Sequence, residues 1–473
     1  MKSNVYFIDL RATTKENLIA KLARLLDTAG LSQTIKQRDL VAVKLHFGEQ
    51  GNTAFIRPVF IRKIVESIKN IGAVPFLTDA NTLYAGTRSD SPHHLLTAIQ
   101  NGFAYAVVDA PIVIADGLRG KSETSVTVNQ KNFKKVYIGS DIMDADALIS
   151  VAHFKGHELS GFGGTIKNVG MGCASRRGKL AQHSTVAPIV IEEKCVGCGD
   201  CMDHCSQNAL SLEEEKAVLD AKKCIGCGEC IIICPNDAIQ IQWDQDIPVF
   251  LENMVEYTMG VLKNKAGKTL FVNFITDISP ACDCYGHNDA PIVRNIGIVA
   301  STDPVAIDQA SVDLVNREQA LPESCLTTNR EKGEDKFKGI YPNVDWTIQL
   351  DYAQSLGLGS RNYNLNKIIA ITICIQPATL KYISGNCDAH VITFSEAFEF
   401  KKKALEVMLE KFLERSEKVV YWMARNVKSL EMIGLLFKAL EKYNTKTSSK
   451  LRLKIFCKYG LYYHRKFDVV PNE

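Results

Sequence analysis

The sequence predicts an α/β fold with a mostly parallel sheet, which is interrupted by a small cysteine-rich segment and followed by a basic, largely helical extension. Three observations predict this organisation. Strand-like and helical runs alternate on both sides of the segment, eight of the 15 cysteines lie between residues 195 and 234, and Lys and Arg outnumber Asp and Glu after residue 400. A chain of 473 residues, 46% hydrophobic and 23% charged, has the length of two or three domains and the composition of a globular protein with a sizeable core.

The α/β domain is predicted from strands that alternate with helical patterns, which argues for a mostly parallel sheet. The strand-like runs are 4–10, 40–47, 74–80, 147–154, 269–278 and 297–301, and the helical runs are 13–30, 57–72 and 93–103. We expect one domain formed by residues 1–185 and 244–365, an insertion at residues 186–243 and an extension over residues 366–473.

The insertion contains the pattern C-x2-C-x2-C-x3-C twice. Its cysteines are Cys195, Cys198, Cys201 and Cys205, then Cys224, Cys227, Cys230 and Cys234, the last followed by Pro235. In this pattern one loop supplies three thiolates to a cubane cluster, and the fourth cysteine ligates the other cluster. We therefore assign Cys195, Cys198, Cys201 and Cys234 to one [4Fe–4S] cluster and Cys205, Cys224, Cys227 and Cys230 to a second.

This segment resembles the bacterial dicluster ferredoxins, and we expect a small α+β module of that kind. Ser206 stands where the pattern expects proline, which loosens a turn but removes no ligand. Two structural zinc sites are the alternative, although zinc sites are normally built from C-x2-C pairs separated by longer gaps.

Basic and polar residues lie at the carboxyl ends of three of the predicted strands or just after them. They are Lys44, His46, Asp79, His153, Lys155 and His157. In open α/β sheets, ligands bind in the crevice outside the carboxyl ends of the strands. In an extended run, alternate side chains point the same way, so the last three would share one face. We expect these six residues to line a polar pocket and to act in catalysis; the alternative is that they are solvated loop residues, since loops after strands are polar anyway.

A glycine-rich run follows this group. Gly161, Gly163 and Gly164 can expose backbone N–H groups, and Lys167 adds positive charge, so an anionic small molecule could bind there. Elsewhere, Leu180 stands where a P-loop requires Ser or Thr, and no dinucleotide fingerprint is complete. Neither ATP nor NAD binding is predicted.

A second group of thiols lies outside the doubled motif. Cys282, Cys284 and His287 occur within six residues, and Cys173 follows the glycine-rich run. Together they could hold a third metal or cluster, or act as redox-active thiols. The alternative is ordinary buried cysteines, because C-x-C alone is not specific.

Several motifs together carry a family resemblance. They are KLHFGEQGNT (44–53), TDANTLYAGTR (78–88), HFKGHELSGFGGTIKNVGMGCASRRGK (153–179), the doubled cysteine motif and IGIVASTDPVAIDQASVDLVN (296–316). From about residue 1 to 365 the chain resembles the domain-of-unknown-function 362 family, in its ferredoxin-containing branch. The resemblance implies a [4Fe–4S] protein in a cytoplasmic, anaerobic setting and brings no established reaction. It would add Asp303 and Asp308 to the pocket, although Asp303 before Pro304 is better explained as a helix N-cap.

The N-terminal residues bear on localisation, and the C-terminal residues are notable for their positive charge. The first residues lack the apolar region and cleavage site of a signal peptide, and no run approaches the roughly 18 apolar residues of a membrane span. We therefore expect a soluble, cytoplasmic protein. Residues 401–473 hold 17 Lys and Arg against 8 Asp and Glu, and residues 400–430 have helical periodicity with a basic face.

The basic extension allows several interpretations. It could bind nucleic acid, anionic lipid or an acidic protein such as an electron donor. The simplest interpretation is a solvated face on a helical cap. Cys374, Cys387 and Cys457 are too scattered to form a predicted site.

Two classes of function remain open. In the first, the protein is an iron–sulfur oxidoreductase whose clusters relay electrons to or from a substrate or cofactor in the polar pocket, with imidazole or ammonium groups supplying protons. In the second, it is a non-catalytic electron-transfer or cluster-carrying partner. A redox partner protein is expected.

Overall fold

The computed structural model describes residues 2–14, 16–84, 86–183, 188–205, 207–224, 228–240 and 246–368, and three short strands beyond residue 370. The chain separates into two compact units, Met1–Leu365 and Asn366–Glu473. Among the described residues, no helix is long and apolar enough to cross a membrane.

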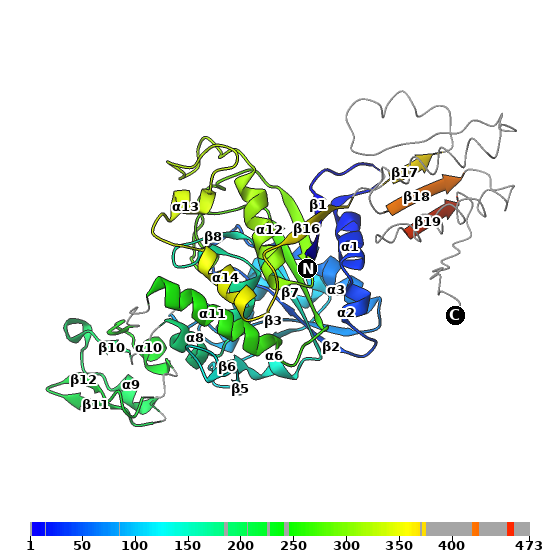
Figure 1. The fold of residues 1–473 in the computed structure, drawn as a ribbon. Coiled ribbons are helices and arrows are strands. Elements are labelled where there is room, and N and C mark those ends of the chain that lie inside the picture. The colour runs from blue at the N-terminus through cyan, green and yellow to red at the C-terminus, as the bar shows by residue number, and fades with distance from the viewer. Residues whose placement is uncertain are drawn as a thin grey trace, which may run out of the picture. The chain divides into compact units, whose positions relative to one another are not determined.

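An eight-stranded sheet forms the centre of the first unit (Figure 1). In spatial order its strands are β16 (Tyr363–Lys367), β1 (Ser3–Asp9), β15 (Gly297–Ser301), β14 (Thr269–Ile275), β7 (Ala147–His153), β2 (Leu40–Lys44), β3 (Val74–Asp79) and β4 (Ile112–Ile114). The five strands from β14 to β4 are parallel, whereas β15 is antiparallel to both β14 and β1. The predicted α/β class with a mostly parallel sheet is confirmed.

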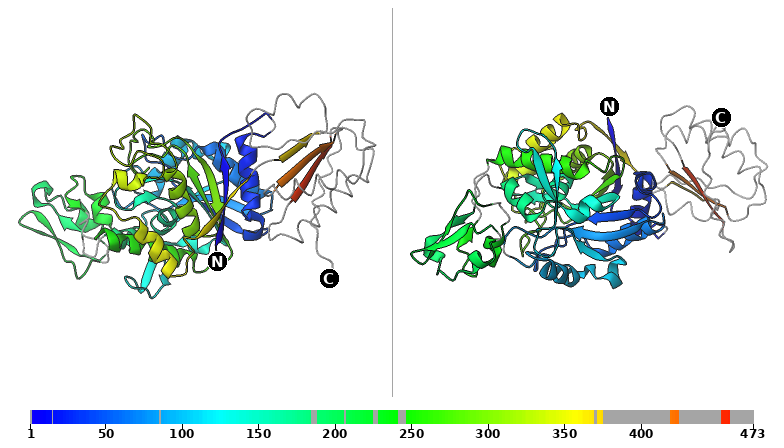
Figure 2. Two further views of the ribbon diagram at one scale, coloured as in Figure 1. Left: turned by 45° about the horizontal axis from the view of Figure 1, so that its top comes forward. Right: turned by 90° about the horizontal axis from the view of Figure 1, so that it is seen from below.

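Helices cover both faces of this sheet, as Figures 1 and 2 show. They are α1 (Leu18–Thr28), α2 (Leu31–Thr34), α3 (Pro58–Lys69), α4 (Ser91–Ala98), α5 (Tyr105–Val108), α6 (Ser140–Asp144), α7 (Thr165–Gly170), α8 (Arg176–His183), α11 (Ile247–Leu262), α12 (Pro304–Asn316), α13 (Lys336–Ile340) and α14 (Thr347–Ser355). Helices α1 and α3 pack together beside β1 and β3, and α7, α11, α12 and α14 form the other layer. Two antiparallel strand pairs complete the unit: β5 (Glu123–Thr127) with β6 (Lys135–Gly139), and β8 (Lys155–His157) with β9 (Gly161–Gly163).

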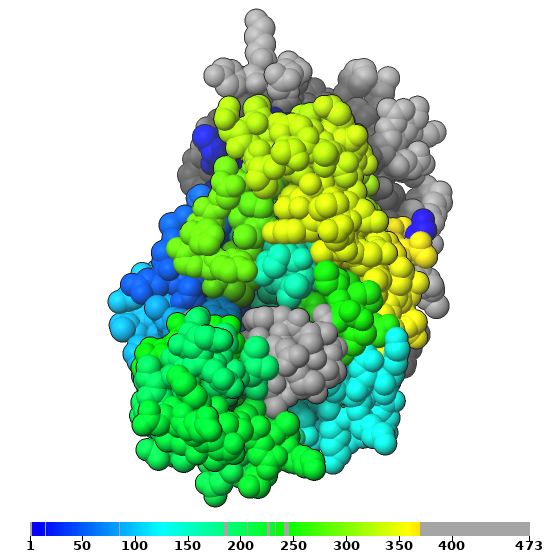
Figure 3. All heavy atoms as spheres, turned by 90° about the vertical axis from the view of Figure 1, so that its left-hand side faces the viewer, coloured from blue at the N-terminus to red at the C-terminus, as the bar shows by residue number. Residues whose placement is uncertain are grey.

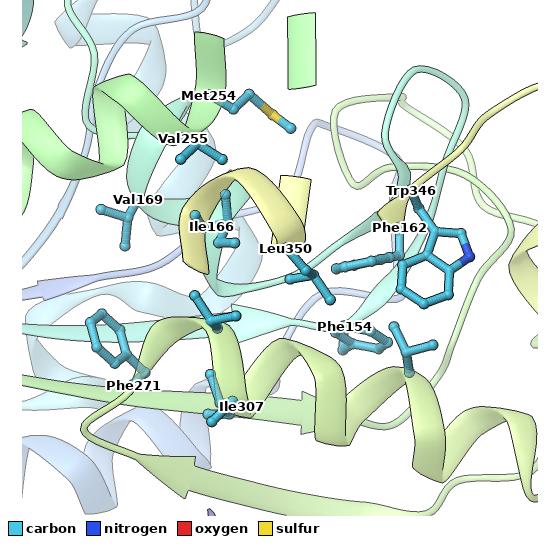
Figure 4. Close-up of a cluster of buried hydrophobic side chains, with 14 of the residues drawn as sticks. Phe154, Phe162, Ile166, Val169, Met254, Val255, Phe271, Ile307, Trp346 and Leu350 are labelled. Carbon is cyan, nitrogen blue, oxygen red and sulfur yellow. The ribbon is translucent and has the colours of Figure 1, made fainter. Parts of the chain in front are cut away.

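The largest hydrophobic cluster lies under the second helical layer (Figure 4). Phe271 of β14 and Ile307 of α12 are buried there, and Phe162 of β9 lies between Phe154 and the indole of Trp346 in a run of ring contacts. Burying an aromatic side chain of this size stabilises the fold by about 2–3 kcal/mol. The cluster therefore fixes the β8–β9 pair, which carries predicted site residues, against the helices.

Most of the predicted boundaries agree with the structure to within a few residues. The strand predicted at 40–47 is shorter in the structure, where β2 ends at Lys44. The ammonium group of Lys44 forms a buried ion pair at this point. The helix predicted at 93–103 continues as α4 only to Ala98. A π-helical turn, Ile99–Phe103, then ends it, with Gly102 in a left-handed conformation at φ 91°.

The inserted segment is small and has little regular structure. Its elements are β10 (Ile189–Val190), a 3-10 turn (Glu192–Lys194), α9 (Asp200–Asp203), β11 (Leu210–Glu213), β12 (Lys216–Leu219), α10 (Glu229–Ile233) and β13 (Ile239–Gln240). The strands form two antiparallel pairs, β10 with β13 and β11 with β12. In Figure 3 the segment, drawn in green, faces the viewer, and the blue and cyan residues of the sheet domain lie behind it. Cys227 and Ser206 lie outside the described residues.

The second unit corrects one prediction. Strands β17 (Ile371–Cys374), β18 (Val419–Ala424) and β19 (Arg452–Cys457) form a parallel sheet. The helix predicted over residues 400–430 is therefore wrong at β18, because the run VVYWM is rich in β-branched and aromatic residues that favour strands. The rest of the basic extension, with Cys387, lies outside the described residues.

Two aspartates of the segment DPVAIDQA organise helix ends. Asp303 caps α12, where its Oδ1 accepts the N–H groups of Val305 and Ala306 at 2.9 and 2.8 Å, so the predicted N-cap is confirmed. Asp308 lies inside α12, fully buried, and its carboxylate accepts the N–H groups of Thr165 and Ile166 at the start of α7, at 2.7 and 2.9 Å. Asp308 therefore joins two helices across the core.

We expect Asp308→Asn to lower the free energy of unfolding by about 2–3 kcal/mol. The N–H groups of Thr165 and Ile166 each donate to one carboxylate oxygen, and asparagine replaces one of these oxygens with an NH2 group that cannot accept. Urea titration followed by circular dichroism measures the change. The matched control is Asp289→Asn at an exposed aspartate, which should change stability little. An Asp308→Asn protein as stable as the parent would show that the carboxylate does not secure α7.

Candidate functional site

A buried ion pair lies at the carboxyl ends of β2 and β3. Lys44 Nζ is 3.0 Å from Asp79 Oδ1, and both side chains are almost fully buried. Burial alone would raise the pKa of Asp79, but the cations around it, Lys44 first, hold that pKa well below its usual range. The carboxylate therefore stays ionised, which supplies the opposite charge that a buried ammonium group requires.

Neighbouring side chains complete this pair. Asn168 of α7 accepts a hydrogen bond from Lys44 Nζ at 2.9 Å, and Arg88 Nη1 lies 3.7 Å from Asp79 Oδ2. A side chain at Gly172 would collide with Lys44, so the close approach of α7 to the pair requires glycine there. The Lys44–Asp79 pair is thus enclosed by protein groups.

Two thiols lie close together at the end of β14, which is two strands away from β2 in the sheet. Cys282 Sγ and Cys284 Sγ are 3.0 Å apart, in the loop that follows β14. Lys167 Nζ lies 3.3 Å from Cys282 Sγ, and His46 Nε2 lies 3.5 Å from Cys284 Sγ. We call these four residues the thiol site.

The charges around the thiol site favour a thiolate. The pKa of Cys282 is lowered to about 5. The hydrogen bond with Cys284 is the main cause, and the Lys167 ammonium also lowers this pKa, whereas burial alone would raise it. Burial alone would lower the pKa of Lys167, but the thiols of Cys282 and Cys284 raise it, so the ammonium stays charged. At neutral pH the site therefore holds a sulfur anion beside a cation.

His46 is a neutral hydrogen-bond donor in this arrangement. Burial, followed by the positive charge of Arg88, lowers the pKa of His46 to about 4. Its Nδ1 accepts the N–H of Gly48 at 3.0 Å, so the ring proton is on Nε2, which faces Cys284. His46 can therefore donate to the sulfur of Cys284.

Asp283, between the two thiols, anchors the loop. Its carboxylate is fully buried and lies 2.9 Å from both His153 Nδ1 and Lys155 Nζ. Its backbone carbonyl accepts the N–H of Glu49 at 3.0 Å. His153 and Lys155 therefore point the same way, as the extended run predicts, and toward one carboxylate.

His153 has no ring nitrogen available for a ligand in this arrangement. Its Nε2 is 2.9 Å from the carbonyl of Thr276, and its Nδ1 faces Asp283. His157 is held differently, because its Nδ1 accepts the N–H groups of Leu159 and Ser160 at 3.1 and 3.2 Å. Burial, and then the charge of Lys167, lowers the pKa of His157 to about 3.

All six predicted pocket residues thus lie at one end of the sheet, and their catalytic role stays a prediction. The glycine-rich run has another use. Gly161 and Gly163 form β9, and the first free N–H groups of α7 go to Asp308, because Gly164 has no side chain to block that carboxylate. Asp308 thus binds the N–H groups just after Gly164, and Lys167 faces Cys282. Binding of an anionic molecule by Gly161, Gly163, Gly164 and Lys167 stays a prediction.

Sequence reasoning missed Asp283, Glu49 and Arg88. Glu49 accepts from Arg88 Nε at 3.1 Å, and Arg88 Nη2 donates to the hydroxyl of Tyr84 at 2.8 Å. The signal for Asp283 was its place between two candidate thiols. Glu49 and Arg88 are both buried, and they are 39 residues apart in the sequence. Motif spacing alone therefore could not predict that they form a pair.

The remaining members of the second thiol group lie elsewhere. Cys173 is fully buried beside Lys44, and burial raises the pKa of its thiol to about 11. His287 is exposed, and its ring lies against that of Tyr285. Within the part of the chain that the structure describes, no three His, Cys, Asp or Glu side chains are placed to hold a single metal ion.

The cysteines of the doubled motif surround two separate hollows. Cys195, Cys198, Cys201 and Cys234 line one. Cys205, Cys224 and Cys230 line the other. Burial, and then the thiols of Cys198 and Cys234, raises the pKa of Cys201. Each hollow therefore takes cysteines from both copies of the motif.

Backbone N–H groups point at the sulfurs of these cysteines. Ala217 N lies 3.3 Å from Cys195 Sγ. Ala209 N lies 3.3 Å from Cys205 Sγ, and Ala238 N lies 3.2 Å from Cys234 Sγ, each four residues after its cysteine. Such donors stabilise negative charge on sulfur.

The inserted segment makes two kinds of contact with the sheet domain. Leu83 packs in the same hydrophobic cluster as Cys201 and Ile231, and a side chain at Gly228 would lie 2.7 Å from Leu83 Cδ1. Buried Glu229 pairs with Arg176 at 3.0 Å and with Arg119 at 2.8 Å.

The residue after Leu83 reaches the thiol site. The hydroxyl of Tyr84 donates to the carbonyl oxygen of Cys284 at 3.2 Å. The dipeptide Leu83–Tyr84 therefore joins the second hollow to the thiol site.

Replacing His157 should reduce the loss of stability in mild acid. A histidine kept neutral when folded, but titrating near pH 6.5 when unfolded, contributes stability that is present above pH 6.5 and is lost as the pH falls toward about 3. We expect the unfolding free energy of His157→Asn to fall less steeply than that of the parent between pH 6 and pH 5, by about 1 kcal/mol per pH unit. Urea titrations at several pH values measure this slope.

The matched control is His287→Asn, at an exposed imidazole, which should keep the parental slope. Asparagine is chosen because its Oδ1 can accept the N–H groups that Nδ1 of His157 accepts. Parallel pH profiles for His157→Asn and the parent would contradict a neutral buried imidazole.

Comparisons with known proteins place the chain in a family. Among solved structures, the lactate racemase apoprotein from Thermoanaerobacterium thermosaccharolyticum is 11% identical, with a TM-score of 0.32, over 96% of this chain and 82% of that one. A protein from Thermotoga maritima is 8% identical, with a TM-score of 0.33, over 77% of this chain and 64% of that one. A search of curated proteins gave no match. The family model described as "Domain of unknown function (DUF362)" matches residues 41–313, more than half of the sequence, and the chain therefore belongs to the DUF362 family.

Proposed function

We propose that the protein carries two [4Fe–4S] clusters in its inserted segment and relays electrons between them and the polar end of the sheet, as an iron–sulfur oxidoreductase. The observation that carries the proposal is the distribution of the motif cysteines around two hollows. One hollow takes three cysteines of the first motif and the last cysteine of the second, which is the crossed pairing expected of two-cluster ferredoxins.

The donor sets fit these groups. Cys195, Cys198, Cys201 and Cys234 would hold one cluster, and Cys205, Cys224 and Cys230 with Cys227 the other. When bound, such clusters supply one-electron transfer. The N–H groups of Ala217, Ala209 and Ala238 fit this use, because hydrogen bonds to cluster sulfurs raise the reduction potential.

The two hollows differ in their surroundings. Cys198 is exposed beside the first hollow, and Val196 there is 67% exposed. The second hollow is lined by Gly228 and Glu229, which contact Leu83 and Arg176 of the sheet domain. This supports entry of electrons from a protein partner at the first hollow and their passage toward the sheet domain from the second.

The residues at the polar end of the sheet would bind and position the reacting group. Lys44 and Asp79 neutralise each other, so their pair supplies a fixed dipole rather than a free charge. His46 holds a proton on Nε2 toward Cys284, and Lys167 holds positive charge beside Cys282. Proton donation in a reduction is therefore best placed at the thiol site.

A non-catalytic electron carrier is the second candidate. It is favoured by two exposed apolar side chains that line the first hollow, Val196 and Leu212, because neighbouring exposed apolar side chains suit a docking protein. The two candidates differ in their response to ligands. Cluster potentials of an enzyme should shift when a small substrate binds, whereas those of a carrier should shift only with a protein partner.

Iron and acid-labile sulfide analysis of anaerobically purified protein tests the proposal directly. We expect about eight irons per chain and, after dithionite reduction, an EPR spectrum of two coupled cubane clusters. About twelve irons would add a third cluster to the two proposed. Protein that retains zinc and no iron would overturn the redox function.

Matched cysteine variants make this test specific. Cys198→Ala removes an exposed cysteine of the motif, and Cys325→Ala removes an exposed cysteine outside it. We expect iron to fall from about eight to about four per chain in the first variant and to stay unchanged in the second. Equal iron contents in both variants would contradict the assignment of Cys198.

A further inference from the structure

We infer that Cys282 and Cys284 form a redox-active dithiol that cycles with an internal disulfide and exchanges with a disulfide substrate. The inference rests on the proposed function for its source of electrons. It rests on geometry for everything else: two sulfurs in contact, a cation at one, a hydrogen-bond donor at the other, and a rigid loop between them.

The two sulfur atoms are placed to bond. Their separation of 3.0 Å must shrink only to the length of a disulfide bond, about 2.0 Å. Asp283 between them is fixed on both sides, by its carboxylate to His153 and Lys155 and by its carbonyl to Glu49. The loop therefore holds the thiols together in the reduced state, so little chain entropy is lost when the bond forms.

Protein groups stabilise the reduced form. Lys167 Nζ, at 3.3 Å, faces the sulfur of Cys282, and the Nε2 proton of His46 faces the sulfur of Cys284. Thiols beside lysine or histidine are the reactive ones in proteins, whereas buried thiols in apolar surroundings are inert. Cys173 is a third thiol near charged side chains, but burial raises its pKa to about 11 and it has no second thiol in contact with it among the described residues, so it stays protonated.

The reductive step balances as follows. Two electrons, delivered one at a time by a ferredoxin- or flavodoxin-class donor through the inserted segment, break the Cys282–Cys284 bond, and one proton from solvent leaves Cys284 as a thiol hydrogen-bonded to the thiolate of Cys282. In the second step, Cys284 passes its thiol proton to the Cys282 thiolate, 3.0 Å away, and attacks a substrate disulfide as the thiolate. The expelled substrate sulfur takes this proton from Cys282 and leaves as a thiol. The thiolate of Cys282 then attacks Cys284, which reforms the internal disulfide and releases the second substrate thiol, protonated from solvent.

Accessibility assigns these roles to the two sulfurs. Cys282 is 1% exposed, whereas Cys284 is partly exposed and is followed by Tyr285, which is 42% exposed. Asn52 holds this outer turn through the carbonyls of Tyr285 and His287, at 3.1 and 3.2 Å. A substrate disulfide can therefore reach Cys284 and not Cys282.

Peptide mapping tests the couple in the intact holoprotein. Trypsin releases residues 269–294, which contain Cys282 and Cys284 and no other cysteine. After anaerobic treatment with diamide, we expect this peptide to lose the mass of two hydrogen atoms, and after reduction with titanium(III) citrate to regain it. The peptide with Cys325 should carry an alkylated thiol throughout.

The exchange step is tested with 5,5′-dithiobis(2-nitrobenzoate) as the substrate disulfide. The reduced parent should release two thionitrobenzoate ions from this pair and end as the internal disulfide. Cys282→Ser should release one and keep the other as a mixed disulfide on Cys284. Cys284→Ser should react slowly, because Cys282 is buried. Equal rates for the two variants would overturn the assigned roles.

Lys167→Met tests the contribution of the cation. Loss of the ammonium group should disfavour the thiolate and shift the dithiol–disulfide equilibrium about tenfold toward the disulfide, or about 30 mV for a two-electron couple. Alkylation of the peptide after equilibration in dithiothreitol buffers measures the potential. Lys338→Met, at an exposed lysine on α13, is the control and should leave it unchanged.

The outcomes separate this inference from the proposed function. Thiols that stay unpaired after diamide, or iron or zinc bound by Cys282 and Cys284, would overturn the dithiol while leaving the two clusters intact. A reversible disulfide in a chain that binds no iron would support the dithiol and remove its proposed source of electrons.

Discussion

The carboxylate of Asp283 is the constraint on which the polar end of the sheet depends. It is fully buried, and a buried charge without partners would cost several kcal/mol. His153, from the end of β7, and Lys155, from β8, supply those partners at 2.9 Å. These contacts fix the loop after β14 against the neighbouring strand, and they set where the sulfurs on either side of Asp283 can lie.

Lys44 and Asp79 likewise supply opposite charges to each other, at the ends of β2 and β3. Parallel strands β2 and β3 finish side by side, and each finishes in a charged residue that is almost fully buried. Asn168 of α7 completes the hydrogen bonding of Lys44, so the helix that carries Lys167 is tied to the same edge. Charge neutralisation and helix position are therefore established by the same contacts.

The α/β class and its mostly parallel sheet could be predicted because strand and helix periods are local signals. The polar strand ends could be predicted as well, since the topology of parallel strands brings them to one edge. The role of Asp308 at α7 could not, because the N–H groups of Thr165 and Ile166 find their acceptor more than a hundred residues away in sequence. The strand at Val419–Ala424 was missed because charged residues on either side of it repeat with a helical period.

The crossed distribution of the motif cysteines has a consequence for biosynthesis. The first hollow needs Cys234, the last of the eight cysteines to leave the ribosome, and the second needs Cys205 from the earlier motif. Neither hollow can therefore be completed before most of the segment has been synthesised, and truncation before Cys224 would leave both incomplete. Under the proposed function, ligand sites of this kind would form together with the fold, and the segment would mature as one unit after translation of its final turn.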